Sequence, residues 1–337
     1  MSMRIYIFLL TVCFTFQMRA QQVPDWENPR VVGINKEEYH STLTLPSGKS
    51  SCEEIVSLNG RWKFYWSPDP QSRPSDFYKN NFDVSGWDNI SVPGTWQLQG
   101  YGKPIYTNWT YPFKKDQPKV TGEPPKHFFS YENRNPVGSY VTTFDVSEDM
   151  KDKQLYLHFE GVKSAMYVWI NGKKVGYSQN SMAPAEFDIT GYVEDGLEHH
   201  LVVRASSDLR SMMQSAGKQS LLLNSHGCQY TRTTGIWQTV WLEAVASAGL
   251  QSVHALTDID QKQLVIHPRF YRDSYKNTLR IVLQENNKKI GTVCVKAANS
   301  SVAVFSLKNV RLWSPESPFL YDLSLIHISE PTRHSLI

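Results

Sequence analysis

Tyr167-Val-Trp-Ile-Asn-Gly-Lys-Lys-Val-Gly-Tyr-Ser178 is the stretch that decides the fold. Before Asn171-Gly172, apolar residues recur at every second position, and Val175 and Tyr177 continue that pattern after it, as in half-buried β-strands. Asn-Gly readily adopts the positive φ angles of a type I′ turn. The stretch therefore predicts a β-hairpin in the middle of the chain.

The same two-residue period recurs along the chain, whereas no long segment shows the 3.6-residue period of a helix. Small residues at Ala246–Gly249 indicate a linker. The predicted strands include Trp62–Trp66, Leu155–Phe159, Leu201–Arg204 and Thr239–Glu243 before the linker, and Ser252–Leu256, Gln263–Phe270, Leu279–Gln284, Ile290–Val295 and Val302–Leu307 after it. Many short strands separated by turn residues predict an all-β fold built from sandwiches.

The composition is that of an ordinary globular protein. Of the 337 residues, 40% are hydrophobic and 20% are charged, and the formal net charge is +3. So small a charge gives no reason to expect nucleic acid as a partner. The ten Trp and seventeen Tyr residues suit sandwich cores and sugar-stacking surfaces, and we expect the core to take most of them.

Residues 1–20 are predicted to be a secretory signal peptide. Arg4 precedes the short apolar stretch Ile5–Phe16, and Ala20 is a suitable last residue before cleavage. No other apolar run approaches the ~18 residues needed to span a bilayer, so no membrane insertion is expected. The mature protein is therefore predicted to be periplasmic or secreted.

Three cysteines remain after the signal peptide, namely Cys52, Cys228 and Cys294. Three scattered cysteines do not make a disulfide framework, so each is expected to be a small buried hydrophobe. His226 lies near Cys228, but one His-x-Cys pair lacks the four ligands of a structural zinc site. No metal ligand is assigned in this chain.

Several long blocks occur in the order seen in a known enzyme family. They are Asp25-Trp-Glu-Asn-Pro29, Ser57-Leu-Asn-Gly-Arg-Trp-Lys-Phe64, Gly102-Lys-Pro-Ile-Tyr-Thr-Asn-Trp-Thr-Tyr-Pro-Phe113, Asn135-Pro-Val-Gly-Ser-Tyr-Val-Thr-Thr-Phe-Asp-Val146, the hairpin stretch and Ala185-Glu-Phe-Asp-Ile-Thr190. From Asp25 to Asp322 the chain resembles glycoside hydrolase family 2, most closely its bacterial β-galactosidases.

The resemblance implies an N-terminal arm at 21–57, a jelly-roll sugar-binding domain at 58–245 and an immunoglobulin-like sandwich at 250–322. In that family two catalytic glutamates lie in a later TIM barrel, and no region of this chain matches the barrel motifs. Retaining glycosidases need two carboxylic acids about 5–5.5 Å apart. We therefore nominate no catalytic residue and expect the chain to be an inactive fragment.

The resemblance also implies part of a sugar pocket. Asn108, in Asn108-Trp-Thr-Tyr-Pro112, matches a loop that reaches the active site, and its amide can donate to and accept from sugar hydroxyls. The alternative is that Asn108 only caps its own loop. Asp208 matches a second pocket segment at its Ser-Asp step only. The shared Arg-x-x-Gly-Ile step at 232–236 is expected to pack the sandwich edge.

The implied partner is a β-galactoside or related oligosaccharide. For the intact enzyme the resemblance allows an oligomer and a magnesium or sodium ion, bound mainly beyond this chain, so no cofactor is expected here.

The segment after Asp322 is unlike the family. Leu323-Ser-Leu-Ile-His-Ile-Ser-Glu-Pro-Thr-Arg333 resembles the conceptual translation of a transposon-end adapter used in sequencing libraries. We interpret residues 323–337 as an adapter-derived artefact, with a genuine final strand as the alternative.

Three functions follow from these patterns. The first is the N-terminal fragment of a retaining exo-β-glycosidase that hydrolyses terminal β-galactosides. The second is a non-catalytic carbohydrate-binding module, because jelly-roll sandwiches can bind sugars without catalysis. The third is a scaffold without a sugar site.

Overall fold

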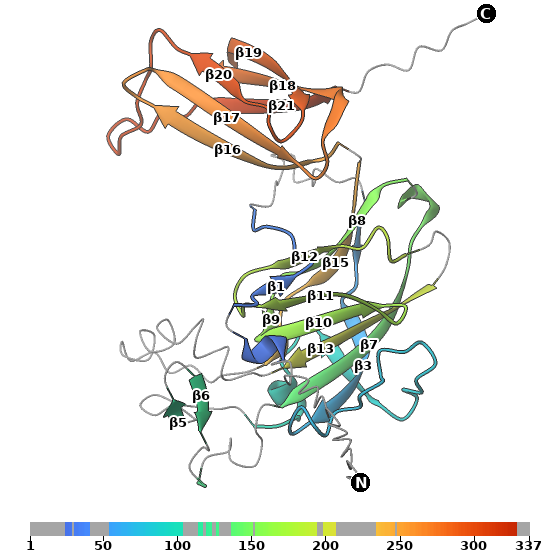
Figure 1. Cartoon of the computed structure of the whole chain (residues 1–337). Helices are drawn as coiled ribbons and strands as arrows, with labels where there is room; N and C mark the ends of the chain where they lie inside the picture. The colour runs from blue at the N-terminus through green and yellow to red at the C-terminus, as the bar shows by residue number, and fades with distance from the viewer. Residues whose placement is uncertain are drawn as a thin grey trace, which may run out of the picture.

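The structure is a computed structural model that describes two β-sandwiches in series, with the second at the top of Figure 1. The described residues are 24–28, 30–40, 54–103, 114–116, 119–122, 126–127, 136–150, 152–193, 198–206, 234–246 and 248–328. Three short 3-10 turns supply the helix in these ranges: η1 (Asp25–Glu27), η2 (Trp96–Gln99) and η3 (Glu148–Met150). None of the helices described is long and apolar enough to cross a membrane.

Two antiparallel sheets form the first sandwich. The larger sheet has the order β1-β11-β10-β13-β7-β3-β4 and the smaller β12-β8-β15-β2. The larger sheet consists of β1 (Gly33–Ile34), β3 (Gly60–Ser67), β4 (Asp88–Val92), β7 (Val137–Asp145), β10 (Ala165–Ile170), β11 (Lys173–Gln179) and β13 (Glu198–Ser206). The smaller consists of β2 (Glu54–Ser57), β8 (Gln154–Phe159), β12 (Ala185–Asp188) and β15 (Val240–Val245). Two short pairs accompany them, β9 (Val162–Lys163) with β14 (Gly235–Ile236) and β5 (Lys114–Asp116) with β6 (Lys119–Gly122).

Alternating residues of both sheets fill the core between them. Leu157 and Phe159 of β8 meet Val168 of β10, and all three are fully buried. Their neighbours in sequence point to the opposite face, as the two-residue period of a strand requires. The predicted jelly-roll sandwich followed by an immunoglobulin-like sandwich is confirmed.

The β-hairpin predicted at Asn171-Gly172 is also confirmed. Asn171 and Gly172 have φ angles of 50° and 78°, and Ile170 pairs with Lys173 across the turn. The side chain of Asn171 accepts a hydrogen bond from the backbone N–H of His200 at 3.1 Å. The turn is therefore held against the neighbouring strand β13 as well as by its own geometry.

Aromatic residues form an additional layer on the outer face of the larger sheet. Tyr167, Trp169 and Phe77 are buried there, and Trp26 packs edge-on against Tyr167 at 5.9 Å. The Tyr167 hydroxyl donates to Asp25 at 2.7 Å. The arm at 24–34 and the loop before β4 thus cover this face, so its aromatic residues pack within the protein.

Two three-stranded antiparallel sheets form the second sandwich, in the orders β16-β17-β20 and β19-β18-β21. The strands are β16 (Leu250–Asp258), β17 (Gln263–Phe270), β18 (Ser274–Glu285), β19 (Lys288–Ala297), β20 (Ala303–Ser306) and β21 (Asp322–Ile328). Ile266, Phe270, Ile281 and Phe305 are buried between the sheets. Each strand predicted after the linker overlaps one of these strands.

Strand β21 includes six residues, 323 to 328, of the segment that we interpret as adapter-derived. It pairs with β18 without a register shift, from Gln284↔Asp322 to Thr278↔Ile328. Leu323 and Leu325 pack against the second core. Because an alternating apolar pattern is enough to add a strand to a sheet edge, this pairing leaves the origin of the segment as a prediction.

The expectation of a buried Cys294 was wrong, because the side chain is exposed. Cys294 lies in β19 between Val293 and Val295, which pack against the core. Successive side chains of a strand point to opposite faces, so Cys294 must face outward. Cys52 and Cys228 lie outside the described residues.

Candidate functional site

Asn108 and Asp208, the two predicted sugar-contact residues, lie outside the described residues. The structure does describe the points at which the chain leaves and re-enters the first sandwich around them. These points are Lys103 and Pro136 on either side of Asn108, and Ser206 and Thr234 on either side of Asp208.

Direct contacts link the two stretches of chain at these points. Ser206, the last residue of β13, pairs with Val137, the first residue of β7. Thr234 donates its N–H to Oε1 of Gln97 at 2.8 Å, and Nε2 of Gln97 donates to the Thr234 hydroxyl at 2.6 Å. The backbone N–H of Trp96 donates to the Thr234 carbonyl at 3.0 Å. Residues that flank Asn108 in the chain are therefore joined directly to residues that flank Asp208.

Buried aromatic rings pack around these anchoring residues. Trp96 packs against Phe64 with 6.2 Å between ring centroids, and both rings are buried. Gly138 lets the Trp96 ring approach the backbone of β7, because a methyl group there would lie 2.4 Å from Cζ3 of that ring. Gly102, with a φ of 68°, turns the chain beside Trp66 just before the Asn108 segment.

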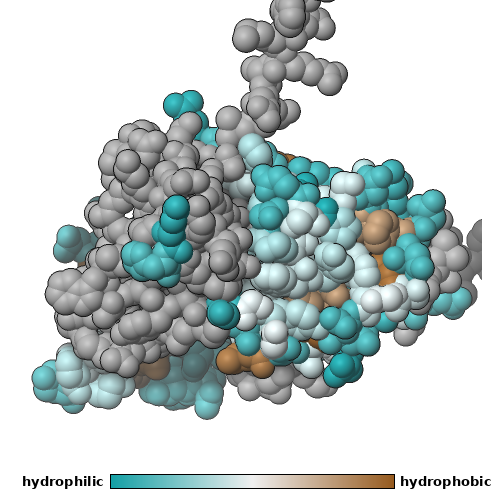
Figure 2. Space-filling view, turned by 90° about the horizontal axis from the view of Figure 1, so that it is seen from below, coloured by the Kyte–Doolittle hydropathy of each residue, from teal (hydrophilic) through white to brown (hydrophobic). Residues whose placement is uncertain are grey.

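The sequence did not predict the Gln97–Thr234 brace, since nothing local marks two residues so far apart as partners. It did indicate the packing role of the neighbouring Gly-Ile step. Ile236 is fully buried, and the Trp237 indole donates to the Ser181 carbonyl at 3.1 Å. Arg232, which begins the step, lies outside the described residues. Seen from below, the described surface is mostly hydrophilic with small hydrophobic patches (Figure 2).

A second polar cluster lies on the outer face of the smaller sheet. His158 of β8 is flanked by Glu186 of β12 and by Trp241 of β15 in the strand register. Nε2 of His158 lies 2.6 Å from Oε2 of Glu243, and Nδ1 lies 3.5 Å from Oε2 of Glu186. The Trp241 ring stacks on the imidazole at 4.9 Å. The imidazole is therefore enclosed by two carboxylates and an aromatic ring.

The arm and the second sandwich cover this outer face. Nε2 of His40 in the arm lies 2.8 Å from Oε2 of Glu186. The ring of Tyr271, which follows β17, lies 4.4 Å from the ring of Tyr156. Burial raises the pKa of Glu37 above its ordinary value, and the charges of Glu186 and Asp188 raise it further. Burial also raises the pKa of the Tyr156 hydroxyl.

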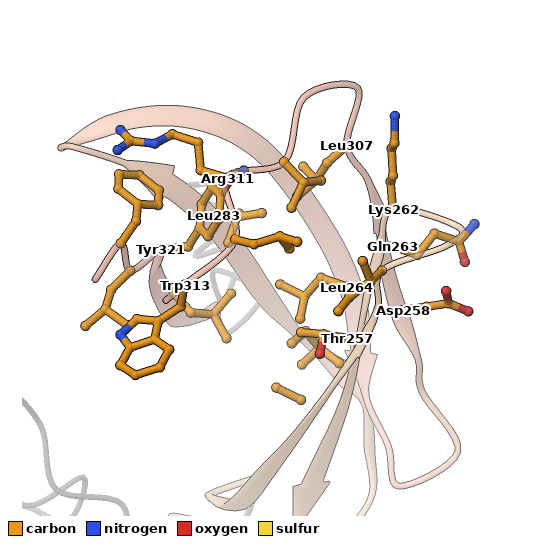
Figure 3. A pocket seen from close by; sticks show the side chains of 18 residues that line it. Thr257, Asp258, Lys262, Gln263, Leu264, Leu283, Leu307, Arg311, Trp313 and Tyr321 are labelled. Carbon is orange, nitrogen blue, oxygen red and sulfur yellow. The ribbon is translucent and has the colours of Figure 1, made fainter. Parts of the chain in front are cut away.

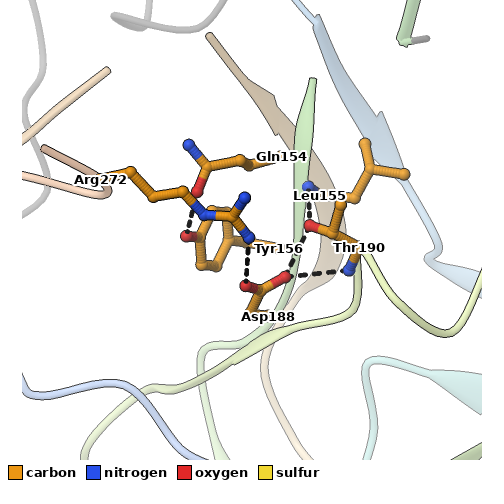
Figure 4. A network of polar contacts seen from close by, with 6 residues as sticks. All are labelled: Gln154, Leu155, Tyr156, Asp188, Thr190 and Arg272. Carbon is orange, nitrogen blue, oxygen red and sulfur yellow. Dashed lines mark hydrogen bonds and ion pairs between the residues drawn. The ribbon is translucent and has the colours of Figure 1, made fainter. Parts of the chain in front are cut away.

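Asp188 connects the two sandwiches at the edge of the cluster (Figure 4). Its Oδ1 accepts hydrogen bonds from the N–H and hydroxyl of Thr190 at 2.9 and 2.6 Å. The Thr190 hydroxyl in turn accepts the N–H of Leu155 at 3.0 Å. Oδ2 of Asp188 lies 3.4 Å from Nη2 of Arg272, which belongs to the second sandwich. The cluster is thus arranged to join parts of the chain, and its acids are already engaged.

The second sandwich also contains a cavity of about 530 Å³ at one end. Leu264, Leu283 and Trp313 line it, whereas Lys262 and Gln263 point away from its centre (Figure 3). Asp258 is the single acid among its lining residues. A retaining glycosidase needs two carboxylic acids, so this apolar cavity lacks the groups for that reaction. Among the described residues, no three His, Cys, Asp or Glu side chains are arranged to hold a metal ion.

Comparison with known proteins supports this two-sandwich organisation. The sequence profile described as "Glycosyl hydrolases family 2, sugar binding domain" matches residues 55–244, and that described as "Glycosyl hydrolases family 2" matches residues 250–330. A β-galactosidase of Halalkalibacterium halodurans is 36% identical over 294 residues, covering 85% of this chain and 27% of the relative. A β-galactosidase of Clostridium acetobutylicum is 33% identical over 314 residues, covering 90% of this chain and 33% of the relative.

Solved structures show the same fold. A β-glucuronidase of Bacteroides uniformis superposes with a TM-score of 0.56 at 19% identity, covering 83% of this chain and 31% of that protein. At this identity the likeness concerns the fold alone. The chain spans 27% to 33% of the length of the three β-galactosidases that it matches in H. halodurans, Priestia megaterium and C. acetobutylicum.

Proposed function

The chain belongs to glycosyl hydrolase family 2, and on that premise we propose that it is the N-terminal fragment of a retaining exo-β-glycosidase that hydrolyses terminal β-galactosides. The observation that carries this proposal is the ordered pair of family matches, together with 36% identity to a β-galactosidase over 294 residues. The part of the reaction assigned to this chain is sugar recognition.

Asn108 and Asp208 are the proposed sugar contacts. The brace between Gln97 and Thr234 supports this proposal, because it joins a residue that precedes Asn108 in the chain to one that follows Asp208. An amide and a carboxylate can together bind neighbouring sugar hydroxyls. The chain covers 27% to 33% of the length of three β-galactosidase relatives, and we propose that the chemical step belongs to the remaining part of the enzyme.

Binding and hydrolysis by the purified chain test the proposal. We expect the purified chain to hydrolyse nitrophenyl β-galactoside no faster than background. We also expect calorimetry to detect heat of galactose binding in the wild type and none in Asn108→Ala. Asn89→Ala is the matched control, since Asn89 is exposed on β4 and should leave binding unchanged. Hydrolysis above background would overturn the assignment of an inactive fragment.

Comparing the binding of different sugars tests the proposed specificity. A preference for glucuronic acid over galactose would overturn the β-galactoside assignment. Absence of any sugar binding would instead favour a scaffold role for the two sandwiches.

The native gene beyond the codon for Asp322 provides a second test. A reading frame that continues into a barrel with two catalytic glutamates would support the fragment assignment and the adapter origin of 323–337. A native stop codon near Ile337, combined with sugar binding, would favour a carbohydrate-binding module instead.

A further inference from the structure

The junction of the arm, the first sandwich and the second sandwich has features that sugar recognition does not explain. A short linker connects the sandwiches, and within it the N–H of Gly249 donates to the carbonyl of Ala246 at 2.7 Å. The N–H of Tyr271 then donates to the carbonyl of Gly249 at 3.1 Å. The linker thus holds Tyr271 beside the outer face of the smaller sheet.

Tyr271 contacts both other parts of the junction. Its ring lies 4.4 Å from that of Tyr156 in β8 and meets that of His40 in the arm edge-on at 6.1 Å. Aromatic rings at these separations attract each other beyond the effect of their buried area. Tyr271 is therefore the apolar centre of the junction.

Ion pairs surround this centre. Arg272 contacts Asp188 at 3.4 Å, and Arg269 contacts Glu38 of the arm at 2.8 Å. Both arginines are more than half exposed, so each pair contributes little to stability. The junction consequently depends on the packing of the Tyr271 ring and on the charges around it.

Negative charge predominates around Tyr271. The titratable and charged groups that face the junction are Glu37, Glu38 and His40 from the arm, Tyr156, His158, Glu186, Asp188 and Glu243 from the first sandwich, and Arg269, Tyr271 and Arg272 from the second. Among the acids, Glu37 is half-buried, and the charges of Glu186 and Asp188 act on its carboxyl group. Its backbone N–H donates to the Glu186 carbonyl at 2.9 Å, so the arm cannot move Glu37 away while it stays docked.

We propose that this junction is an acid-tightened clasp, in which protonation of Glu37 relieves repulsion within the acid cluster and lets the arm and Tyr271 pack together. At acid pH the two sandwiches then behave as one body, and at alkaline pH the second sandwich separates from the first.

The sign of the effect follows from the folded state. Burial and the neighbouring acids hold the pKa of Glu37 above its ordinary value in the closed clasp. The closed state therefore binds a proton more readily than the open state, and its stability declines as the pH rises through the raised pKa.

Calorimetry and small-angle scattering of the full chain at about pH 5 and about pH 8 test the clasp. We expect one unfolding transition at the lower pH, and two transitions with a larger radius of gyration at the higher pH. Glu37→Gln should show one transition at both pH values, because the residue no longer titrates. Glu316→Gln is the matched control, as it removes an exposed acid at the other end of the second sandwich and should behave as wild type.

Tyr271→Ala should show two transitions at both pH values, whereas Tyr275→Ala should not, since Tyr275 is 65% exposed. If Tyr271→Ala fails to fold, the comparison of Glu37→Gln with Glu316→Gln still decides the question. The same number of transitions at both pH values in wild type would overturn the proposal, as would an unchanged pH response in Glu37→Gln.

Discussion

Gly138→Ala should destabilise the first sandwich through a single added methyl group. The new Cβ would lie 2.4 Å from Cζ3 and 2.6 Å from Cε3 of Trp96, and 2.8 Å from Cε2 of Phe64. Real Cβ atoms do not approach other atoms so closely, so at least one ring must move. Both rings are buried in a filled core and have no open space to enter.

Overpacking of this kind costs about 1–3 kcal/mol. We expect a value near the upper end, about 3 kcal/mol, because two rigid rings are met at once. For a domain of this size, that loss lowers the melting temperature by roughly 6–12 °C. The φ of Gly138 lies outside the left-handed region, so backbone strain adds nothing to this cost.

Gly191→Ala is the matched control, since no heavy atom lies within 4 Å of its added methyl group and its φ is also ordinary. It should leave stability unchanged or raise it by about 0.4–1 kcal/mol through the unfolded state. Urea unfolding followed by tryptophan fluorescence, together with calorimetry, measures both variants. A second substitution, Trp96→Phe, should recover part of the loss in Gly138→Ala by shortening the ring that is struck.

A change of less than about 0.5 kcal/mol in Gly138→Ala would refute this reasoning, because that is the range of an ordinary surface substitution. An equal loss in Gly191→Ala would refute it too, since the cause would then be the chemistry of the substitution and not the contact with Trp96.

Three other predictions concern the polar clusters and the N-terminus. His158→Ala should cost about 3–5 kcal/mol in urea unfolding, because it removes the buried imidazole that lies 2.6 Å from the largely buried carboxylate of Glu243, and a loss below about 1 kcal/mol would contradict this. Thr234→Val should cost about 1 kcal/mol by removing the hydroxyl that accepts from Gln97, and should weaken galactose binding; stability that falls with unchanged binding would separate the brace from the sugar site. Secreted protein should begin at Gln21 by intact mass, and retention of residues 1–20 would exclude cleavage after Ala20.

The hairpin at Asn171-Gly172 shows which features could be predicted from sequence. Its turn depends on the φ preferences of two adjacent residues, and its strands depend on a two-residue period that any window of the chain displays. The order of the two sandwiches could likewise be read from consecutive blocks. The same two-residue period could have predicted the exposure of Cys294, because Val293 and Val295 on either side of it face the core. The general tendency of cysteine to be buried predicted the opposite and was wrong here.

The burial of His158 and Tyr156 could not be predicted from the sequence. Both alternate with core residues in β8, so their strand pattern assigns them to the outer face, as observed. Both are nevertheless buried, since His40 and Tyr271 come from parts of the chain that no local pattern connects to β8.

The sequence by itself determined the strands, the central turn, the two sandwiches and the family. These depend on side-chain size and backbone preference over a few residues, or on blocks that keep their order along the chain. The tertiary structure alone decided that Thr234 braces Gln97, that Trp96 meets Gly138, and that the backbone of Glu37 is hydrogen-bonded to that of Glu186. Those contacts join distant segments, and they form only when the sheets have packed and brought the ends of those segments together.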